Sequence, residues 1–380
     1  MNGDPYQTTP VGRPRARGLG IPFGGTPGPW NAITDVPGVE VGYTTLIEGD
    51  GVRTGVTAIH PRGRGNPGDA CAAGFHSLNG NGEMTGMAWV EESGSTAGPI
   101  CFTNTHAIGA AHQAVVRWTH RCRPDLTRGW ILPVVAETWD GYLNDINGEH
   151  VTVDVAVQAL EAAEIGPVEE GSVGGGTGMN CYHFKGGSGT ASRIVEHADT
   201  GYTVGAFVQA NFGARRELTI AGVPLGAALA EDDPMEEHFS GAFAGGSVIT
   251  IVATDAPLLP NQCKAFARRV GLGLARTGTS SSHFSGDLFL AVSTANGGAF
   301  THGLRSLHPE GRREYDSLRF IPWGSLDPFY EAVVQATEES VVNALVANED
   351  MVGFEGHRTP ALPRDRVVEL LGARGVLSIA

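Results

Sequence analysis

Residues 244–252 read AGGSVITIV, which joins a glycine pair, a serine and an apolar run. Gly245 and Gly246 stand directly before Ser247, and the apolar residues that follow reach the length of a β-strand. A mostly apolar run of that length is typical of a strand covered on both faces. On this pattern alone, the favoured interpretation is a glycine turn that enters a buried strand, with Ser247 as an ordinary turn residue.

Three further apolar runs of strand length lie at residues 130–137, 203–211 and 287–294. Helices are expected at 260–276, at 364–371, and from Asp327, which we interpret as an N-cap before a proline at the first helical position. Strands buried on both faces require layers above and below them. Two sheets packed face to face with helices outside, an αββα sandwich, satisfy that requirement. A three-layer α/β sheet fits nearly as well, and the pattern does not separate the two.

The organisation of the chain favours one domain. Its 380 residues are enough for one large domain or two ordinary ones, and no clean linker interrupts them. Residues 1–30, rich in Pro, Gly and Arg, are interpreted as an extended arm that wraps a neighbouring subunit. The Pro/Gly clusters at 61–69 and 171–189 are expected to be loops inside one fold, so a single domain over residues 1–380 is predicted.

The composition argues against several classes of function. Hydrophobic residues make up 41% of the chain, which allows a substantial core, and the net charge of −15 argues against nucleic acid and anionic membranes as partners. The five cysteines form no CxxC pair and the thirteen histidines form no HxH or HExxH motif, so no metal site is predicted. The sequence shows no secretory or membrane-spanning apolar segment, and a cytoplasmic protein is expected.

Longer blocks around these features resemble one known family. The blocks are GFHSLNGNGEMTG at 74–86, PVVAETWDGYLNDINGEH at 133–150, GSVGGGTGMNCYHFKGGSGTASR at 171–193, GGSVITIVATDAPLLPNQ at 245–262 and SSHFSGDLFLAVSTAN at 281–296. In this order they resemble the DmpA-type peptidase family, which comprises L-aminopeptidase/D-Ala-esterase/amidases and β-peptidyl aminopeptidases. The resemblance covers nearly the whole chain.

The resemblance implies an αββα fold and a chain that cuts itself. The cut would fall between Gly246 and Ser247 and give subunits 1–246 and 247–380, with Ser247 as a new N-terminal nucleophile. Glycines before the scissile bond can adopt backbone conformations closed to other residues. The freed α-amine has a reference pKa of about 7.7–8.0, so nucleophile and base would sit on one residue. The family also implies a homotetramer of such two-subunit units, with no metal or cofactor.

Three further residues receive roles by the same resemblance. Ser285 would orient Ser247, and Asp287 would stabilise its protonated amine. Asn211 resembles an oxyanion-hole asparagine, a kind of donor that contributes ~10²–10³ in rate. Without the family, Asp287 would be a solvated carboxylate at a strand start, and Asn211 a turn residue at a strand end.

Glu137 and Trp139 are expected to contact the substrate. Glu137, in ETWDG, matches the family glutamate that receives the free amine of the substrate. Trp139 departs from members that carry tyrosine at this position, and tryptophan keeps a donor but supplies no phenol. That departure puts the rate or the substrate range in question.

Other candidates have simpler interpretations. The glycine-rich stretch 171–189 lacks the lysine of a phosphate-binding loop and is expected to serve packing. His283 is interpreted as a loop histidine without a catalytic role. Asp255 is interpreted as a cap of the 260–276 helix, and Trp118 as part of a helix packing face.

The leading hypothesis is a hydrolase that removes an N-terminal residue from small peptides, amino-acid amides or esters through an acyl-enzyme on Ser247. L-α, D-α and β-amino acids all occur as substrates among the relatives. One alternative is an acyltransferase similar to the ornithine acetyltransferases, which also cut themselves, though before threonine. The other alternative is an uncut, non-catalytic binding protein.

Overall fold

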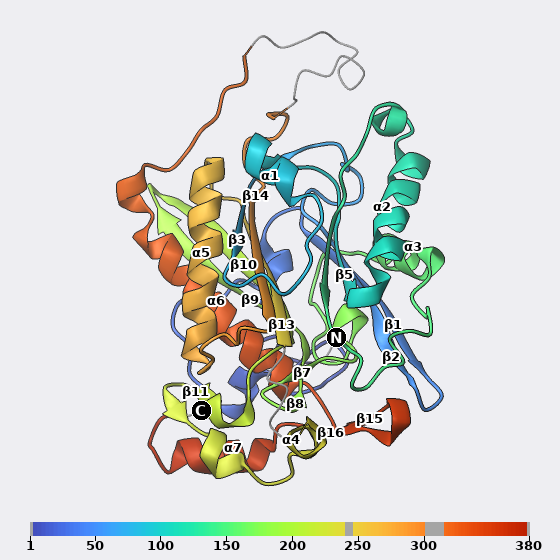
Figure 1. Ribbon diagram of the computed structural model, residues 1–380. Helices are drawn as coiled ribbons and strands as arrows, with labels where there is room; N and C mark the ends of the chain where they lie inside the picture. Colours follow the sequence, from blue (N-terminus) through green and yellow to red (C-terminus); the bar gives the residue numbers. More distant parts are fainter. Residues whose placement is uncertain (1–2, 240–245, 301–314, 378–380) are drawn as a thin grey trace.

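Two β-sheets stacked face to face occupy the centre of the molecule (Figure 1). The computed structural model describes residues 3–239, 246–300 and 315–377, so Gly245 lies outside the described residues. The first sheet has six strands in the order β4-β3-β14-β13-β10-β9. Their bounds are β3 Cys71–Ser77, β4 Ser95–Thr96, β9 Gly187–His197, β10 Thr200–Asn211, β13 Gly246–Thr254 and β14 Ser285–Ser293.

The second sheet has four strands in the order β1-β2-β5-β6. Their bounds are β1 Glu40–Glu48, β2 Val52–His60, β5 Ile100–Asn104 and β6 Val134–Thr138. Three short ladders lie outside the sheets: β7 (Asn180–Cys181) with β8 (Phe184–Lys185), β11 (Thr219–Ile220) with β12 (Val223–Pro224), and β15 (Met351–Val352) with β16 (Arg358–Thr359).

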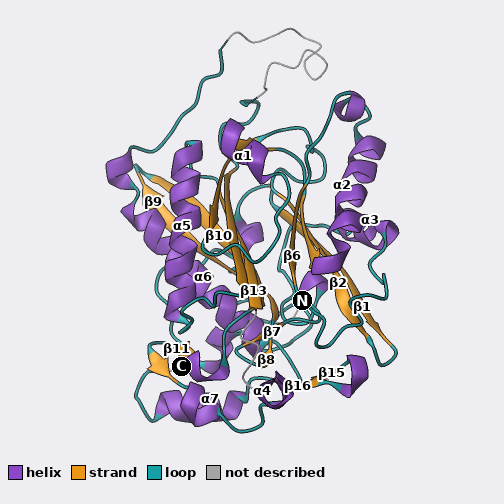
Figure 2. Cartoon of the chain, viewed as in Figure 1, coloured by secondary structure: helices purple, strands orange, loops and turns teal. Residues whose placement is uncertain are grey.

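Helices cover the outer face of each sheet (Figure 2). On the six-stranded sheet lie α5 (Pro260–Arg276) and α6 (Asp327–Val346), and on the four-stranded sheet lie α2 (Ile108–Cys122) and α3 (Val153–Glu161). The other α-helices of the described residues are α1 (Met87–Ser93), α4 (Pro234–Phe239) and α7 (Arg364–Gly372). The layers therefore form the expected αββα sandwich, and the three-layer alternative is wrong.

Side chains from the inner faces of both sheets share one apolar core. Phe102 of β5 and Phe207 of β10 stack with ring centroids 5.8 Å apart, and both are fully buried. Ile249 and Ile251 of β13 belong to the same core. Successive residues of a strand alternate between faces. Ser247, two positions before Ile249, therefore also points between the sheets.

Three of the four apolar runs become sheet strands close to their predicted bounds. β13 fills the run that follows Gly245, and β10 and β14 include most of the next two. The run at 130–137 is predicted too long, because β6 begins only at Val134. Pro133 has no amide to donate to a ladder, and Trp130 is 65% exposed, so the chain before β6 passes over the surface.

The helix bodies agree with the predictions, whereas two capping interpretations are wrong. α5 has the predicted bounds, and α2 buries Trp118. α6 starts at Asp327, so Asp327 lies inside the helix and is not its N-cap. Asp255 does not cap α5. Its Oδ1 accepts a bond from the Thr203 amide at 2.7 Å, and the α5 cap is made instead by Gln262, which accepts from the Leu259 amide.

The N-terminal arm is fixed to its own chain. Arg15 forms an ion pair with Glu170 at 2.6 Å, and Arg17 pairs with Glu339 at 2.7 Å. Arg15, Glu170 and Glu339 are buried, and removing one partner of a buried pair costs about 3–5 kcal/mol. The described part of the arm is therefore a component of this fold, and its expected contact with a neighbouring subunit stays a prediction. Among the described residues, no helix is long and apolar enough to cross a bilayer.

Candidate active site

A cavity of about 560 Å³ opens where β6 ends and β13 begins. It is lined by Asn81, Gly82, Glu83, Thr105, Glu137, Trp139, Phe239, Gly246, Ser247 and Phe284. These described lining residues include a serine and two carboxylates, but no basic side chain. The cavity thus combines a hydroxyl with negative charge and aromatic walls.

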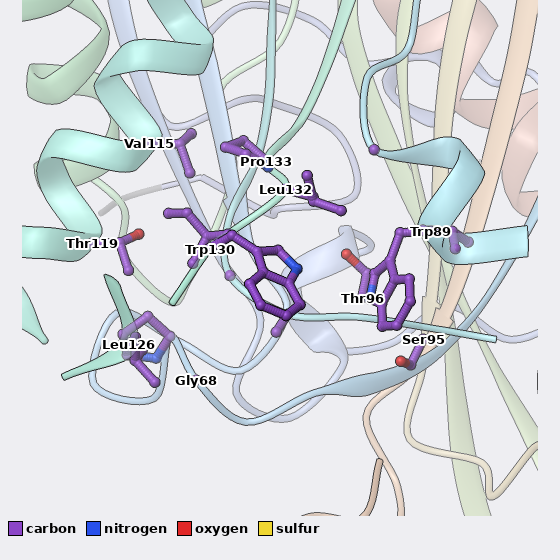
Figure 3. A pocket seen from close by; sticks show the side chains of 16 residues that line it. Gly68, Trp89, Ser95, Thr96, Val115, Thr119, Leu126, Trp130, Leu132 and Pro133 are labelled. Carbon is purple, nitrogen blue, oxygen red and sulfur yellow. The ribbon is translucent and has the colours of Figure 1, made fainter. Parts of the chain in front are cut away.

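A second cavity, of about 220 Å³, lies beside α1 and α2 (Figure 3). Trp89, Leu126, Trp130 and Leu132 are among its lining side chains, and none of its described lining residues is acidic or basic. Acid–base and nucleophilic catalysis require such groups. The cavity at Ser247 is therefore the candidate active site.

Ser247 is the second residue of β13 and is 3% exposed. It pairs with Asn211 on β10 and with Gly286 on β14. Glycine at position 286 lets the Asn81 backbone approach β14 closely, because a Cβ at 286 would lie 2.6 Å from the Asn81 carbonyl oxygen. The Ser247 side chain therefore faces the cavity between two strands that fix its backbone.

Gly246 is required for a different reason from the one expected. It is the first residue of β13, and its φ does not lie in the left-handed region. A Cβ at this position would lie 2.6 Å from the Asn211 carbonyl oxygen and 2.8 Å from Phe212 Cα. Glycine at 246 thus permits a close approach of two backbones, and the expected special conformation is absent there.

Ser285 and Asp287 lie on the face of the sheet opposite the Ser247 side chain. In the parallel β13–β14 register, the pairs are Gly246–Ser285, Ser247–Gly286 and Val248–Asp287. Paired residues share a face, and successive residues alternate. The backbone nitrogen of Ser247, however, lies in the plane of the sheet, and the Val248 amide favours the ionised form of Asp287. The side chains of Ser285 and Asp287 therefore project from the face opposite the Ser247 side chain, and their expected contacts with Ser247 stay predictions.

Asp287 is buried within a set of polar donors. Its carboxylate accepts bonds from Ser285 Oγ at 2.5 Å, from Asn79 Nδ2 at 3.1 Å and from Ser281 Oγ. Burial raises the pKa of Asp287 above its ordinary value, while these donors oppose the rise. A cation placed beside a buried carboxylate favours its charged form. The arrangement can therefore hold an ammonium group on the Ser247 backbone nitrogen.

Asn211 is held in one orientation by two hydrogen bonds. Its Nδ2 donates to the Trp139 carbonyl oxygen at 2.9 Å, and its Oδ1 accepts from the Asn180 amide at 2.8 Å. A side-chain amide carries two N–H donors. One donor fixes the group, and the other is available to a developing oxyanion. Asn211 is not among the cavity-lining residues, but it pairs with Ser247 in the β10–β13 register, so the two side chains lie on the same face of the sheet.

Glu137 is the penultimate residue of β6 and is only 4% exposed. Its Oε1 accepts from the Glu83 amide at 2.9 Å, and its Oε2 accepts from Thr105 Oγ1. Burial raises the pKa of Glu137 despite these donors. A buried carboxylate that faces a cavity is suited to bind a substrate ammonium group, because the ion pair restores the solvation that burial removes.

Several residues at the site have no place among the sequence predictions. Glu83 is exposed at the cavity wall, and its negative charge adds to the rise in the Glu137 pKa. Phe239 and Phe284 contribute aromatic walls. The block at 74–86 marked the region of Glu83, but neither spacing nor residue type distinguished it from the other surface carboxylates.

Asp140, three positions after Glu137, is fully buried. Asn144 Nδ2 donates to its Oδ1 at 3.1 Å, while its Oδ2 has no hydrogen-bond partner in the described part of the chain. Burial raises the pKa of Asp140 to about 7. Asp140 directly follows Trp139, whose carbonyl oxygen accepts a hydrogen bond from Asn211. The titratable Asp140 carboxyl is therefore adjacent in the chain to the residue that orients Asn211.

The remaining candidates keep structural roles. The stretch 171–189 is packed by its glycines: a Cβ on Gly189 would lie 2.0 Å from the Ser340 carbonyl oxygen of α6. His283 does not line the cavity, and its ring contacts Phe284 at a centroid distance of 5.1 Å. Within the described ranges, no three His, Cys, Asp or Glu side chains are grouped as a metal site would require.

The sandwich with a serine at the start of a central strand defines the class of N-terminal-nucleophile hydrolases. The sequence pattern of peptidase family S58 matches residues 31–359, and the chain belongs to that family. The chain is 45% identical over 375 residues to "Beta-peptidyl aminopeptidase BapA" of Sphingosinicella microcystinivorans, covering 94% of this chain and 92% of that protein.

Solved structures agree with this assignment. The L-aminopeptidase D-Ala-esterase/amidase of Ochrobactrum anthropi, described as a variant of the Ntn hydrolase fold, superposes with a TM-score of 0.89 at 44% identity, covering 96% of this chain and all of that chain. A β-aminopeptidase of a Burkholderia species gives a TM-score of 0.85 at 44% identity, over 95% and 99% of the two chains. The expected family, fold and enzyme class, an aminopeptidase-type hydrolase, are therefore confirmed.

Proposed function

We propose that the chain cuts itself between Gly246 and Ser247 and that Ser247 then acts as an N-terminal nucleophile. The products would be the subunits 1–246 and 247–380. The observation that carries this proposal is the shared cavity, which Ser247 and the buried Glu137 both line. The substrates proposed are small peptides, amino-acid amides and esters with a free amine.

Self-cleavage begins with an acyl shift. The Ser247 oxygen attacks the Gly246 carbonyl carbon, the C–N bond breaks, and the hydroxyl proton passes to the departing nitrogen. Water then hydrolyses the ester and leaves a carboxylate on Gly246 and a free amine on Ser247. Because β10 and β14 hold the backbone on both sides of Ser247, the new amine stays where Asp287 can stabilise its protonated form.

Turnover uses the same groups. The neutral amine accepts the Ser247 hydroxyl proton while the oxygen attacks the substrate carbonyl, and the leaving amine or alcohol then takes that proton. The second Nδ2 hydrogen of Asn211 stabilises the oxyanion, a role worth ~10²–10³ in rate. Water releases the acyl group by the same steps in reverse order. Glu137 holds the substrate ammonium group and so restricts attack to the first residue.

Assembly rests on the family resemblance, by which four two-subunit units form a homotetramer. A cytoplasmic location rests on the five widely spaced cysteines, whose odd number suggests free thiols in a reducing compartment. Sedimentation of the processed protein tests the proposed assembly, since a mass of about 160 kDa is expected for four chains of 39.7 kDa. A mass near that of one chain would refute it.

Intact-mass measurement under denaturing conditions tests the cut. Chains of about 26 and about 14 kDa are expected, scaled from chain length, with Ser247 as the new N-terminus. The Ser247→Ala variant is expected to remain a single chain of 39.7 kDa and to be inactive. A wild-type chain that stays whole and hydrolyses no amide or ester refutes the proposed function.

A further inference from the structure

Helix α4 ends at the wall of the candidate active site. Phe239, its last residue, lines the cavity together with Ser247 and Gly246. Phe239 lies seven positions before Gly246, so α4 is the last described element of the proposed first subunit. The wall formed by Phe239 thus belongs to the polypeptide that the cut would end.

The start of α4 is anchored by charged groups. Asp233 precedes the helix, and its Oδ1 accepts from the Glu236 amide at 3.1 Å. His183 Nδ1 lies 2.9 Å from Asp233 Oδ2, and the Arg215 guanidinium lies 4.0 Å from the same oxygen. Asp233 and His183 are largely buried. Their contacts fix the direction in which the helix leaves the body of the protein.

The end of α4 is held by aromatic packing. Tyr142, which is 2% exposed, contacts Phe239 at a ring-centroid distance of 5.8 Å and stacks on His357 at 4.6 Å. His238 contacts both Tyr142 and His357, at 5.5 and 4.5 Å. Met235 packs with Tyr142 in the same small core, to which Phe239 and Trp139 are added. Aromatic pairs of this kind contribute beyond their buried area.

These anchors come from both sides of the proposed cut. Tyr142 and His183 precede position 246, whereas His357 follows it, and Arg358 of β16 forms an ion pair with Asp232 just before α4. Figure 1 shows α4 beside β16. None of these contacts depends on an intact bond between Gly246 and Ser247. The helix and Phe239 therefore keep their place after cleavage.

We propose that Phe239 determines specificity by packing against the side chain of the residue that the enzyme removes. This inference rests on the proposed function. In the self-cleavage reaction, Gly246 is the acyl group, and the chain between it and Phe239 lies on the acyl side of the bond. A substrate acyl residue takes the place of Gly246, with its amine at Glu137 and its carbonyl at Ser247. Its side chain then meets the aromatic wall of Trp139 and Phe239.

The test compares two acyl residues that differ in apolar bulk. The substrates are p-nitroanilides. Leucine, as its L or D enantiomer, is compared with glycine, and β-homoleucine is compared with β-alanine. The pair that the wild type hydrolyses is used. In Phe239→Ala, the ratio of kcat/KM for the large over the small residue is expected to fall about 10-fold, within the range for lost apolar contact in a pocket. The rate on the small residue stays within about two-fold.

Controls separate specificity from stability. Phe320→Ala removes a half-exposed ring outside the cavity and is expected to leave the ratio unchanged. Self-cleavage of each variant, read by intact mass, reports that the fold is intact. If Phe239→Ala remains uncut, Phe239→Leu carries the test, because leucine keeps apolar packing and loses the ring. Its ratio is expected to fall about three-fold.

The outcomes are distinct. A ratio that stays unchanged in the Phe239 variants, or equal losses on both residues, overturns the inference and leaves the proposed function standing. A wild type that hydrolyses none of the substrates overturns the proposed function and this inference together. A loss of kcat/KM confined to the larger residue, in a Phe239 variant that still cuts itself, supports the inference that Phe239 determines specificity.

Discussion

Replacing Glu137 with glutamine isolates the contact that we propose for the free amine of the substrate. The substitution keeps the shape of the side chain and removes its charge. Glu137 is 4% exposed and already accepts from the Glu83 amide and from Thr105. Glutamine retains one acceptor oxygen for these donors. The main loss is therefore the charged partner of the substrate ammonium group.

The magnitude follows from the kind of bond that is lost. A hydrogen bond to a charged group contributes about 1.5–3 kcal/mol. At about 1.4 kcal/mol for each factor of ten, kcat/KM for a free-amine substrate is expected to fall about 10- to 150-fold. The N-acetylated form of the same substrate makes no such ion pair. Its slower hydrolysis is expected to change less than about three-fold.

The assay measures kcat/KM for an amino-acid p-nitroanilide and its N-acetyl derivative, in wild type and Glu137→Gln. Glu83→Gln is the matched control, because Glu83 is exposed and solvent screens exposed charges. It is expected to cost less than about three-fold. Equal losses on both substrates would show that Glu137 supports the structure, and no loss on the free amine would show that the amine binds elsewhere. Either result refutes the reasoning.

Three other substitutions test the remaining parts of the site. Gly246→Ala places a Cβ 2.6 Å from the Asn211 carbonyl oxygen, and overpacking of about 1–3 kcal/mol is expected to slow self-cleavage roughly 10-fold or more, measured by intact mass over time. Asn211→Ala is expected to lower kcat about 10²- to 10³-fold, and an unchanged kcat in a fully cut variant would remove Asn211 from the oxyanion role. Asp140→Asn tests a titration: the folded pKa of Asp140 is raised to about 7 from an ordinary 3.8, so its contribution to stability is fully present below about pH 4 and is lost as the pH rises towards 7. Relative to wild type, this variant is expected to gain up to about 4 kcal/mol between pH 4 and 7, measured by chemical unfolding, and parallel curves would contradict the assignment.

The central strands and helices could be predicted because their signals are local. The run after Gly246 is apolar at successive positions, as burial on both faces requires, and β13 follows it to its end at Thr254. α5 likewise follows its helical spacing. The strand predicted at 130–137 begins too early, because residue type alone does not show that the Trp130 side chain is exposed. Its environment depends on the chain packing against α1 and α2.

The site could be predicted only in part, because strand register is a tertiary property. Family resemblance named Ser285 and Asp287, but the parallel pairing of β13 and β14 decides which face they occupy. The cavity itself joins β6, α4 and β13, segments far apart in the chain, so Glu83 and Phe239 carry no local signal of their place in it. The capping role predicted for Asp255 depends on its closeness in sequence to α5. In the structure, its carboxylate instead accepts a hydrogen bond from the Thr203 amide of β10.

The order of strands in the larger sheet has a consequence for the proposed cut. β14 and β13 come from after position 246, yet they lie between β3 and β10, which come from before it. A chain cut there would consist of two polypeptides, neither of which contains the complete six-stranded sheet. To part them, the long ladders on both sides of the inserted strands must break, which amounts to unfolding the domain.

Two polypeptides that share one sheet in this way are expected to unfold together, as a single cooperative domain. If the cut takes place as proposed, the bond between positions 246 and 247 links the two parts during folding and keeps them at high local concentration. Once the β3–β14 and β10–β13 ladders have formed, the fold no longer depends on the bond between positions 246 and 247. If the two parts were made as separate chains, they would have to associate from solution without this high local concentration. Encoding both parts in one reading frame avoids that step.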